Sequence, residues 1–313
     1  MGDIQETSKL VDYRKRKYYW GWIPVGLLFL SLVLGWYAVL FKGLIGEFAW
    51  YSLQIIGPLF GILFLVVTLV KIIRHRKGTL RQWITFGCSI LAILPVIGLV
   101  VPVRYPYFLA YAQPAATVRL PADVPLQVIW GGDELKNNYH VISPDQRWAY
   151  DFLVEPYFSN STQLKDYGCY GVPVIAPIDG TIIAAHDGEP DETPGLESNN
   201  ITQPRGNYVV IQMESGTYLL IAHLQPGSVA VKAGDKVSEG QVLGACGNSG
   251  NTSEPHIHIH HQRINPEVWP NGFGEGLPLY FRDQDGPLMP EGGYQVVDNE
   301  AIPLGPVVKN LAK

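Results

Sequence analysis

The chain has 313 residues, and only 16% of them are charged, against roughly 25% in an average soluble protein. The charge is also divided unevenly. Residues 1–103 carry 11 Lys and Arg and 4 Asp and Glu, a net charge of +7, whereas residues 104–313 carry 12 and 24, a net charge of −12. A single uniform soluble domain is therefore excluded. A nucleic-acid partner for the acidic part is excluded too, because nucleic acid requires a basic surface.

Three long segments of the first part contain no charged residue, namely residues 18–41, 48–70 and 82–103. Each exceeds the roughly 20 apolar residues that a helix needs to cross a bilayer. Pro24, Pro58 and Pro95 lie within these segments, and membrane helices tolerate proline better than soluble helices do. Aromatic residues gather near both ends of the first segment, as they do at membrane interfaces. We predict three transmembrane α-helices that bind a lipid bilayer and serve as an anchor.

The positions of Lys and Arg predict the orientation of these helices. They cluster in residues 1–17 and 71–81, whereas the connection between the first two predicted helices holds only Lys42. By the positive-inside rule residues 1–17 are cytoplasmic, and three spans place everything after Val103 outside. A cleaved signal peptide is a poor alternative, because no small-residue cleavage site follows the first segment and two more segments come after it.

The second part has the pattern of a β domain. Short apolar or alternating runs are separated by Gly, Pro, Asn and Asp, which is typical of strands joined by turns. Strands are predicted within residues 174–185, 208–213, 217–222 and 241–245. We predict an all-β fold, an antiparallel sandwich or barrel. Residues 104–137 would be a linker with the first strands, residues 138–262 the domain itself, and residues 263–313 a C-terminal extension packed on it.

An acidic segment, residues 187–206, interrupts the β pattern. It contains the five carboxylates Asp187, Glu189, Asp191, Glu192 and Glu197. A solvated rim loop is one interpretation, and recognition of a cationic substrate is another.

Histidines are the most informative residues of the second part. Four of the eight lie in the run His-Ile-His-Ile-His-His that begins at His256. Because side chains alternate between the faces of a strand, His256, His258 and His260 share one face, and Ile257 and Ile259 share the other. Apolar residues in a core would hold the imidazoles at a fixed spacing, as a metal site requires. Adventitious metal binding by a His-rich tract is the alternative, but such tracts lack the alternating Ile.

Four segments around this run closely resemble the lysostaphin-type (LytM) zinc endopeptidases. They are residues 171–180 (Gly-Val-Pro-Val-Ile-Ala-Pro-Ile-Asp-Gly), 218–224 (Tyr-Leu-Leu-Ile-Ala-His-Leu), 231–243, and 244–258 (Gly-Ala-Cys-Gly-Asn-Ser-Gly-Asn-Thr-Ser-Glu-Pro-His-Ile-His). The resemblance covers residues 138–262. It implies a domain of the duplicated-hybrid-motif superfamily that cuts peptide bonds of bacterial peptidoglycan with one Zn²⁺ per chain.

The resemblance also implies roles for individual residues. His258 corresponds to a zinc ligand of the family, and His256 and His223 correspond to its two catalytic imidazoles. The other ligands of the family are a His and an Asp four residues later in the chain. Asp151 matches the Asp, but Arg147 stands where the His is expected. A guanidinium stays protonated and cannot donate a lone pair to a metal ion.

His140 is the histidine nearest to Asp151 on its N-terminal side. If residues 138–152 form a hairpin with Pro144 and Asp145 as its loop, His140 and Asp151 are diagonal neighbours on one face, about 7–8 Å apart. Both side chains then reach one zinc ion. A loop longer by one residue would turn His140 to the opposite face. We predict His140 as the third ligand, with an ordinary polar strand position as the alternative.

These assignments together predict a zinc metalloendopeptidase. With His140, Asp151 and His258 as ligands, zinc keeps one position open for water. His223 and His256 would share the roles of general base and of acid or oxyanion stabiliser. The predicted substrates are peptidoglycan peptides outside a bacterial cell membrane that the chain crosses several times. The alternative is a catalytically inactive relative that binds cell wall or regulates a partner hydrolase. A biotinyl- or lipoyl-type carrier is not supported, because the Met-Lys-Met attachment site is missing.

Other residues have weaker assignments. His260 shares the face of His258 and is either a residue behind the ligands or a surface residue of the strand. His186 and His261 have no assigned role. Cys169 and Cys246 are both predicted to lie outside, where a disulfide between them is permitted. A cysteine ligand is not expected, because the predicted His/Asp set completes a zinc site.

Overall fold

The structure is a computed structural model that describes residues 19–97, 104–196 and 200–311. The chain divides into two compact units, residues 1–103 and 104–313. The basic N-terminal stretch 1–17, the last six residues of the third predicted span and Glu197 of the acidic segment lie outside the described residues.

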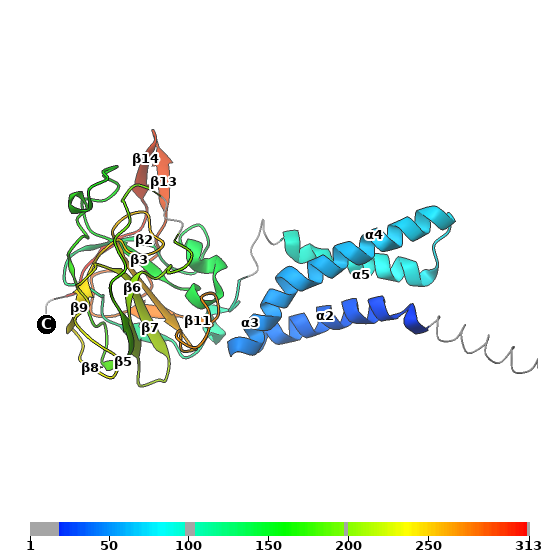
Figure 1. Ribbon diagram of the computed structural model, residues 1–313, viewed down its shortest axis with the longest axis horizontal. Coiled ribbons are helices and arrows are strands. Elements are labelled where there is room, and N and C mark those ends of the chain that lie inside the picture. The colour runs from blue at the N-terminus through cyan, green and yellow to red at the C-terminus, as the bar shows by residue number, and fades with distance from the viewer. Residues whose placement is uncertain (1–18, 98–103, 197–199, 312–313) are drawn as a thin grey trace, which may run out of the picture. The chain divides into compact units, whose positions relative to one another are not determined.

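The first unit is helical (Figure 1). Its helices are α2 (Ile23–Val39), α3 (Gly43–Tyr51), a π-helical turn η1 (Ser52–Ile56), α4 (Gly57–His75) and α5 (Leu80–Ile97). α4 packs closely against α5 at Gly61, where an added Cβ would lie only 2.9 Å from the carbonyl oxygen of Ser89. α3, η1 and α4 follow one another without a break and form a single helix of 33 residues, Gly43–His75.

The prediction of three transmembrane helices is corrected in this unit. Among the described residues, only the helix Gly43–His75 is long and apolar enough to cross a membrane by length and composition. The apolar helices on either side of it are shorter, Ile23–Gly35 and Leu80–Leu94. Charge-free segments proved to be poor guides to helix ends, because the long helix begins before Phe48 and includes Glu47, whose side chain is buried.

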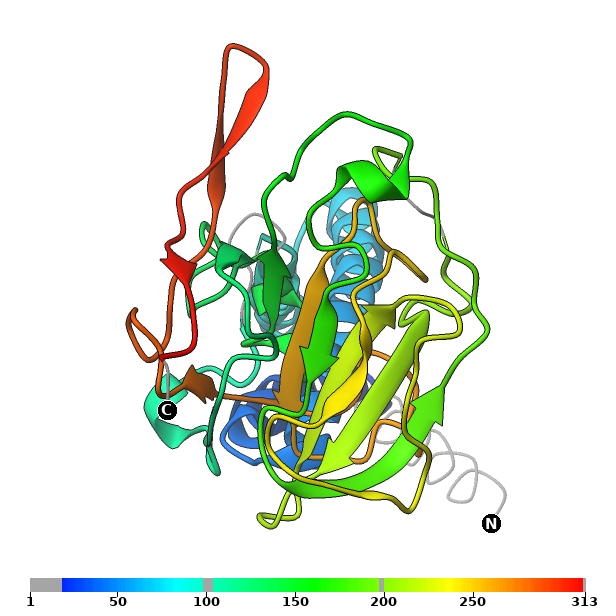
Figure 2. The same cartoon turned by 90° about the vertical axis from the view of Figure 1, so that its left-hand side faces the viewer.

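The second unit is built around an open sheet (Figures 1 and 2). Nine strands of the described residues form it. In sheet order its strands are β15 (Val307–Val308), β2 (Leu126–Trp130), β3 (Tyr150–Leu153), β10 (Ile257–Gln262), β7 (Tyr218–Leu224), β6 (Asn207–Gln212), β5 (Gly180–His186) and β8 (Lys236–Val237), with β11 (Gly276–Leu277) paired to β10. All pairings in this sheet are antiparallel.

Smaller elements complete the unit. Three further strand pairs lie among the described residues: β1 (Ala116–Val118) with β12 (Leu279–Phe281), β4 (Pro173–Ile175) with β9 (Val242–Ala245), and β13 (Tyr294–Val297) with β14 (Glu300–Pro303). The short 3₁₀ turns are η2 (Leu109–Tyr111), η3 (Tyr139–Ile142), η4 (Pro144–Gln146) and η5 (Leu164–Asp166). The hairpin β13–β14 projects from the rest of the unit (Figure 2).

The predicted all-β domain is confirmed as a mostly β domain, with two corrections to its architecture. The main sheet is antiparallel as predicted, but the pair β1–β12 is parallel. The main sheet is also not a closed barrel, because its strand order runs from β15 to β8 without joining these ends.

The hydrophobic core lies on one face of the main sheet. Alternate residues of β6, β7 and β10 are buried there together with residues of β4, β9 and β12; they are Val209, Ile211, Leu219, Ile221, Ile257, Ile259, Val174, Leu243 and Phe281. A second, smaller group of Val210, Leu220 and Ala222 lies on the intervening positions of β6 and β7. A disulfide joins Cys169 to Cys246, which follows β9. The two-residue period of the strands thus leaves one face of the sheet for other side chains.

Candidate metal centre and active site

The centre of the site is the pairing of β3 with β10. Asp151 and His258 are direct partners in this antiparallel ladder, and directly opposed side chains lie on the same face of a sheet. The distance between Asp151 Oδ1 and His258 Nδ1 is 2.8 Å. Both side chains are almost completely buried.

His140 reaches this centre from outside the sheet. The predicted hairpin over residues 138–152 is wrong, because residues 139–142 and 144–146 form the 3₁₀ turns η3 and η4. The side chain of Asn138 caps η3 by accepting from the backbone N–H of His140, and such side-chain bonds compete with strand formation. The Nε2 atom of His140 nevertheless lies 3.5 Å from Asp151 Oδ2.

Arg147 is directed away from the cluster. Its guanidinium is buried and pairs with Asp133 Oδ1 at 2.6 Å, and it lies 4.6 Å from the ring centre of Trp148. Burial lowers the pKa of Arg147 to about 10. Arg147, four residues before Asp151, therefore makes structural contacts with Asp133 and Trp148. His140 lies beside the Asp151 carboxylate instead.

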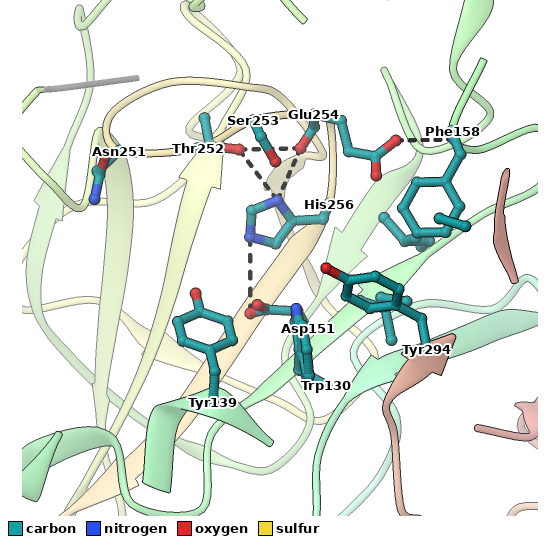
Figure 3. A pocket seen from close by; sticks show the side chains of 13 residues that line it. Trp130, Tyr139, Asp151, Phe158, Asn251, Thr252, Ser253, Glu254, His256 and Tyr294 are labelled. Carbon is teal, nitrogen blue, oxygen red and sulfur yellow. Dashed lines mark hydrogen bonds and ion pairs between the residues drawn. The ribbon is translucent and has the colours of Figure 1, made fainter. Parts of the chain in front are cut away.

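His223 and His256 complete the cluster around His258. The ring centres of His223 and His256 are 4.7 Å apart, and those of His223 and His258 are 5.7 Å apart. His223 is the penultimate residue of β7 and has φ of 61°, a left-handed conformation that is costly for a non-glycine residue. His256 precedes β10, and its Nε2 points toward Asp151 Oδ1 at 3.7 Å (Figure 3).

Backbone carbonyls orient these two imidazoles. His223 Nδ1 donates to the carbonyl of Ser249 at 2.8 Å, and His256 Nδ1 donates to the carbonyl of Glu254 at 2.8 Å (Figure 3). A carbonyl accepts only, so in each neutral ring the proton is on Nδ1 and the lone pair is on Nε2. Both rings can therefore accept a proton at Nε2.

A chain of hydrogen bonds likewise orients His258. Gln262 donates its amide to the carbonyl of Ile264, so its Oε1 faces His260 Nε2 and accepts from it at 2.9 Å. His260 Nδ1 then accepts from His258 Nε2 at 2.9 Å. The lone pair of His258 therefore lies on Nδ1 and faces Asp151 Oδ1. Two acceptors this close repel each other unless a cation or a proton lies between them.

The same argument applies to His140. Asn138 donates its amide to the carbonyls of Gly132 and Ala149, at 3.0 and 3.1 Å. Its Oδ1 is thereby turned toward His140 Nδ1, from which it accepts at 3.0 Å. The lone pair of His140 lies on Nε2 and faces the Asp151 carboxylate.

Three lone-pair atoms thus converge, from His140, Asp151 and His258, all within 4.8 Å of one another. Two imidazoles and a carboxylate are a donor set that suits zinc. A second group, His223, His256 and His258, satisfies the same distance limit. The first group fits a cation better, because it contains the only carboxylate of the two groups.

The protonation states agree with this fit. Burial lowers the pKa of His140 to about 3 and holds the pKa values of His223 and His260 well below their ordinary value. Burial alone would raise the pKa of Asp151, but the neighbouring imidazoles, His140 first among them, hold it below the usual range. Neutral imidazoles and an ionised carboxylate are the forms that bind metal.

Three contributors to the site were missed or left open by the sequence. Asn138 and Gln262 hold the rings of His140 and His260 and were not singled out, although an Asn before a short turn is a recognisable cap. His260 is buried and bonded to the ring of His258. Of its two interpretations, the structure therefore favours a residue behind the ligands over a surface residue of the strand. His186 lies 3.3 Å from Glu189, outside the cluster.

Two carboxylates of the acidic segment form hydrogen bonds within the domain. Asp187 accepts from the backbone N–H groups of Gly227 and Val229. Asp191 accepts from the backbone N–H of Asn248 and from the Tyr170 hydroxyl. These carboxylates hold loops together, so the structure favours the rim-loop interpretation.

The fold and the site together define a β domain with a histidine–aspartate cluster suited to binding a metal ion. Residues 164–270 match the sequence model of peptidase family M23. About a third of the chain, all of it within the second unit, is thus similar to peptidases of this family. The matched segment includes His223, His256 and His258, while His140 and Asp151 precede it.

Two curated proteins are also similar to part of the chain. The chain is 31% identical over 130 residues to the peptidoglycan DD-endopeptidase ShyA of Vibrio cholerae, which covers 41% of this chain and 28% of that protein. It is 37% identical over 89 residues to the peptidoglycan DD-endopeptidase ShyC of the same organism, covering 28% of this chain and 18% of that protein. The chain thus spans less than a third of the length of either relative.

Two bacterial peptidases are among the solved structures to which part of the chain is similar. The catalytic domain of lysostaphin from Staphylococcus simulans is 22% identical, with a TM-score of 0.27, over 41% of this chain and 73% of that one. A zinc-containing peptidase from Vibrio cholerae is 21% identical, with a TM-score of 0.32, over 52% of this chain and 39% of that one.

Proposed function

We propose that the protein is a membrane-anchored zinc metalloendopeptidase that hydrolyses peptide bonds of bacterial peptidoglycan. The observation that carries this proposal is the convergence of the lone pairs of His140 and His258 on the carboxylate of Asp151. These three residues would hold one zinc ion. The M23 match and the relation to two peptidoglycan DD-endopeptidases support the peptidase activity and the choice of substrate.

The tautomers of His223 and His256 suit both rings to proton transfer. Zinc, when bound, would act as a Lewis acid toward the scissile carbonyl and the attacking water. His256 and His223 each present an unprotonated Nε2 near the metal group. One ring would take the proton of the water, and the resulting imidazolium would donate it to the leaving amine or stabilise the oxyanion. Fixing Nδ1–H on a backbone carbonyl keeps each ring in the orientation that this transfer needs.

We also propose that the helical unit anchors the domain to the membrane. The helix Gly43–His75, which is long and apolar enough to cross a bilayer, supports this anchor. The disulfide between Cys169 and Cys246 supports an oxidising compartment for that unit. This location would bring the site to its proposed substrate.

A catalytically inactive relative is the less favoured function. Its main support was Arg147 in place of a ligand, but Arg147 pairs with Asp133 and leaves His140 beside Asp151. An inactive domain would also have no chemical need for the oriented Nε2 atoms of His223 and His256.

The test measures zinc content and cleavage separately, on the full chain in detergent. We expect one zinc ion per chain by elemental analysis and cleavage of cross-linked muropeptides. His140→Ala and His258→Ala should lose zinc. His223→Ala and His256→Ala should keep zinc and lose about 10²–10⁴-fold in cleavage rate. His186→Ala, outside the cluster, should change neither.

Two results would contradict the proposal. If the zinc-supplemented chain holds no metal and cuts no muropeptide, it is not this enzyme. If His140→Ala keeps full zinc while His223→Ala and His256→Ala lose it, the ligands are the second histidine group and the roles are exchanged.

A further inference from the structure

A cavity of about 480 Å³ opens beside Asp151 and His256 (Figure 3). Four aromatic residues, Trp130, Tyr139, Phe158 and Tyr294, line part of its wall. The ring of Trp130 makes edge-to-face contacts with Tyr139 and Tyr294, with ring centres 5.2 and 5.3 Å apart. The ring centre of Phe158 lies 6.3 Å from that of Tyr294.

This cavity is joined directly to the proposed catalytic residues. Trp130 is the ladder partner of Asp151 at an irregularity between β2 and β3. Tyr139 precedes His140 and contacts its ring at 4.0 Å between centres. A group bound in the cavity would therefore lie next to the bond that is cut.

The C-terminal hairpin β13–β14 supplies one wall. Tyr294 and Ala301 of this hairpin line the cavity, and both lie outside the segment 164–270 that matches the M23 family. The pocket thus depends on residues of the C-terminal extension that lie beyond the matched part of the domain.

The cavity wall carries one acidic side chain outside the metal cluster. Glu254 lines it, and its Oε2 accepts from the backbone N–H of Phe158 at 3.0 Å (Figure 3). A neighbouring cavity of about 540 Å³ shares Phe158 and Glu254 and adds Glu300. Among the described residues that line these two cavities there is no Lys or Arg. Burial raises the pKa of Glu254 to about 7, so a bound cation would favour its ionised form.

We propose that this pocket, formed by Trp130, Phe158, Tyr294 and Glu254, binds an ammonium group on a side chain of the substrate peptide. Aromatic faces attract a cation through their quadrupoles, and a partly buried carboxylate gains an ionic partner that a neutral side chain does not provide. The role in substrate choice rests on the proposed peptidase function, whereas ammonium binding itself does not.

The binding test uses three soluble peptides of the form acetyl-Ala-X-Ala-amide. X is lysine, Nε-acetyllysine or norleucine, so the probes differ in the charge and polarity of one side-chain end. Calorimetry on the full chain in detergent, at a pH of about 8 and with His223→Ala to prevent cutting, should show that the lysine peptide binds about tenfold more tightly than either neutral peptide. The preference should be present with zinc and after chelation.

Variants locate the preference. Glu254→Gln should abolish most of it, and Tyr294→Leu should reduce it several-fold. Val296→Ala changes an exposed residue of the same hairpin and should leave it intact. The proposal is overturned if the three peptides bind alike, if norleucine binds as tightly as lysine, or if Glu254→Gln keeps the full preference.

Failure of this proposal can be separated from failure of the proposed function. A chain that binds zinc and cuts muropeptides but does not prefer lysine refutes only the pocket. A chain that holds no zinc and cuts nothing but still prefers the lysine peptide refutes only the enzyme.

Discussion

His258 and His260 are joined by a direct hydrogen bond between their rings, 2.9 Å from Nε2 to Nδ1. The bond uses the nitrogen of His258 that faces away from Asp151, and Gln262 fixes His260 from behind. His260 therefore determines which nitrogen of His258 is available to a metal ion.

His260→Ala should weaken zinc binding without removing a ligand. Residues behind the ligands of a metal site are typically worth about 10–100-fold in affinity, and we expect a loss in that range. Competition with a zinc chelator measures it on the full chain. His186→Ala is the control, and equal affinities for His260→Ala and the unmodified chain would contradict the role.

Gly250→Ala should disturb His223 through the backbone. Gly250 has φ of 87°, and an added Cβ would overlap the backbone nitrogen of Gly206. The shift would move the adjacent carbonyl of Ser249, which orients His223. We expect cleavage to fall by at least tenfold while zinc content stays unchanged, because His223 is not among the proposed ligands.

Gly188→Ala is the matched control for this substitution. Gly188 also has positive φ, 113°, but an added Cβ there meets no atom within 4 Å. Both substitutions carry a backbone penalty of about 1 kcal/mol, and only Gly250→Ala meets a neighbouring backbone. Equal activities of the two variants would show that the close approach is unimportant.

His261 should make the stability of the second unit depend on pH. The ring is buried between the Thr217 hydroxyl and the carbonyl of Pro278, and burial lowers its pKa to about 4. The unfolded chain, with a pKa of about 6.5, binds the proton first. Stability is therefore complete above about pH 6.5 and is lost as the pH falls toward about 4.

His261→Gln removes this titration while keeping a polar side chain. Between about pH 7 and pH 5 the unmodified chain should lose about 2 kcal/mol more stability than the variant. Denaturant unfolding at both pH values measures the difference, and the other buried histidines affect both chains equally. The same pH dependence in both chains would show that His261 does not titrate in this way.

The disulfide should stabilise the second unit substantially. Cys169 and Cys246 are 77 residues apart in sequence, and removing a native disulfide typically costs about 2–5 kcal/mol. The double substitution Cys169→Ala with Cys246→Ala should lower the midpoint of thermal unfolding of the second unit. Cys88→Ala is the control, because Cys88 is a free thiol, and equal midpoints in the two variants would contradict the prediction.

The sequence alone determined the elements whose signal is local. Alternation along β10 predicts that His258 and His260 share a face opposite Ile257 and Ile259, and the two isoleucines are indeed in the core. This prediction succeeds because the two-residue period of a strand is set by backbone geometry. Apolar length likewise indicates the long helix Gly43–His75, but the ends of helices depend on caps and neighbours that charge-free segments do not report.

Only the tertiary structure decided how the site is assembled. A 3₁₀ turn capped by Asn138 places His140 beside Asp151. The alternation of side chains along a strand had predicted this proximity only for a hairpin. Arg147 pairs with Asp133. Tyr294, which is distant in sequence from the other residues of the pocket, lines one of its walls. These outcomes depend on competition between local side-chain bonds and strand pairing, and on contacts between residues distant in sequence, neither of which a periodic pattern encodes.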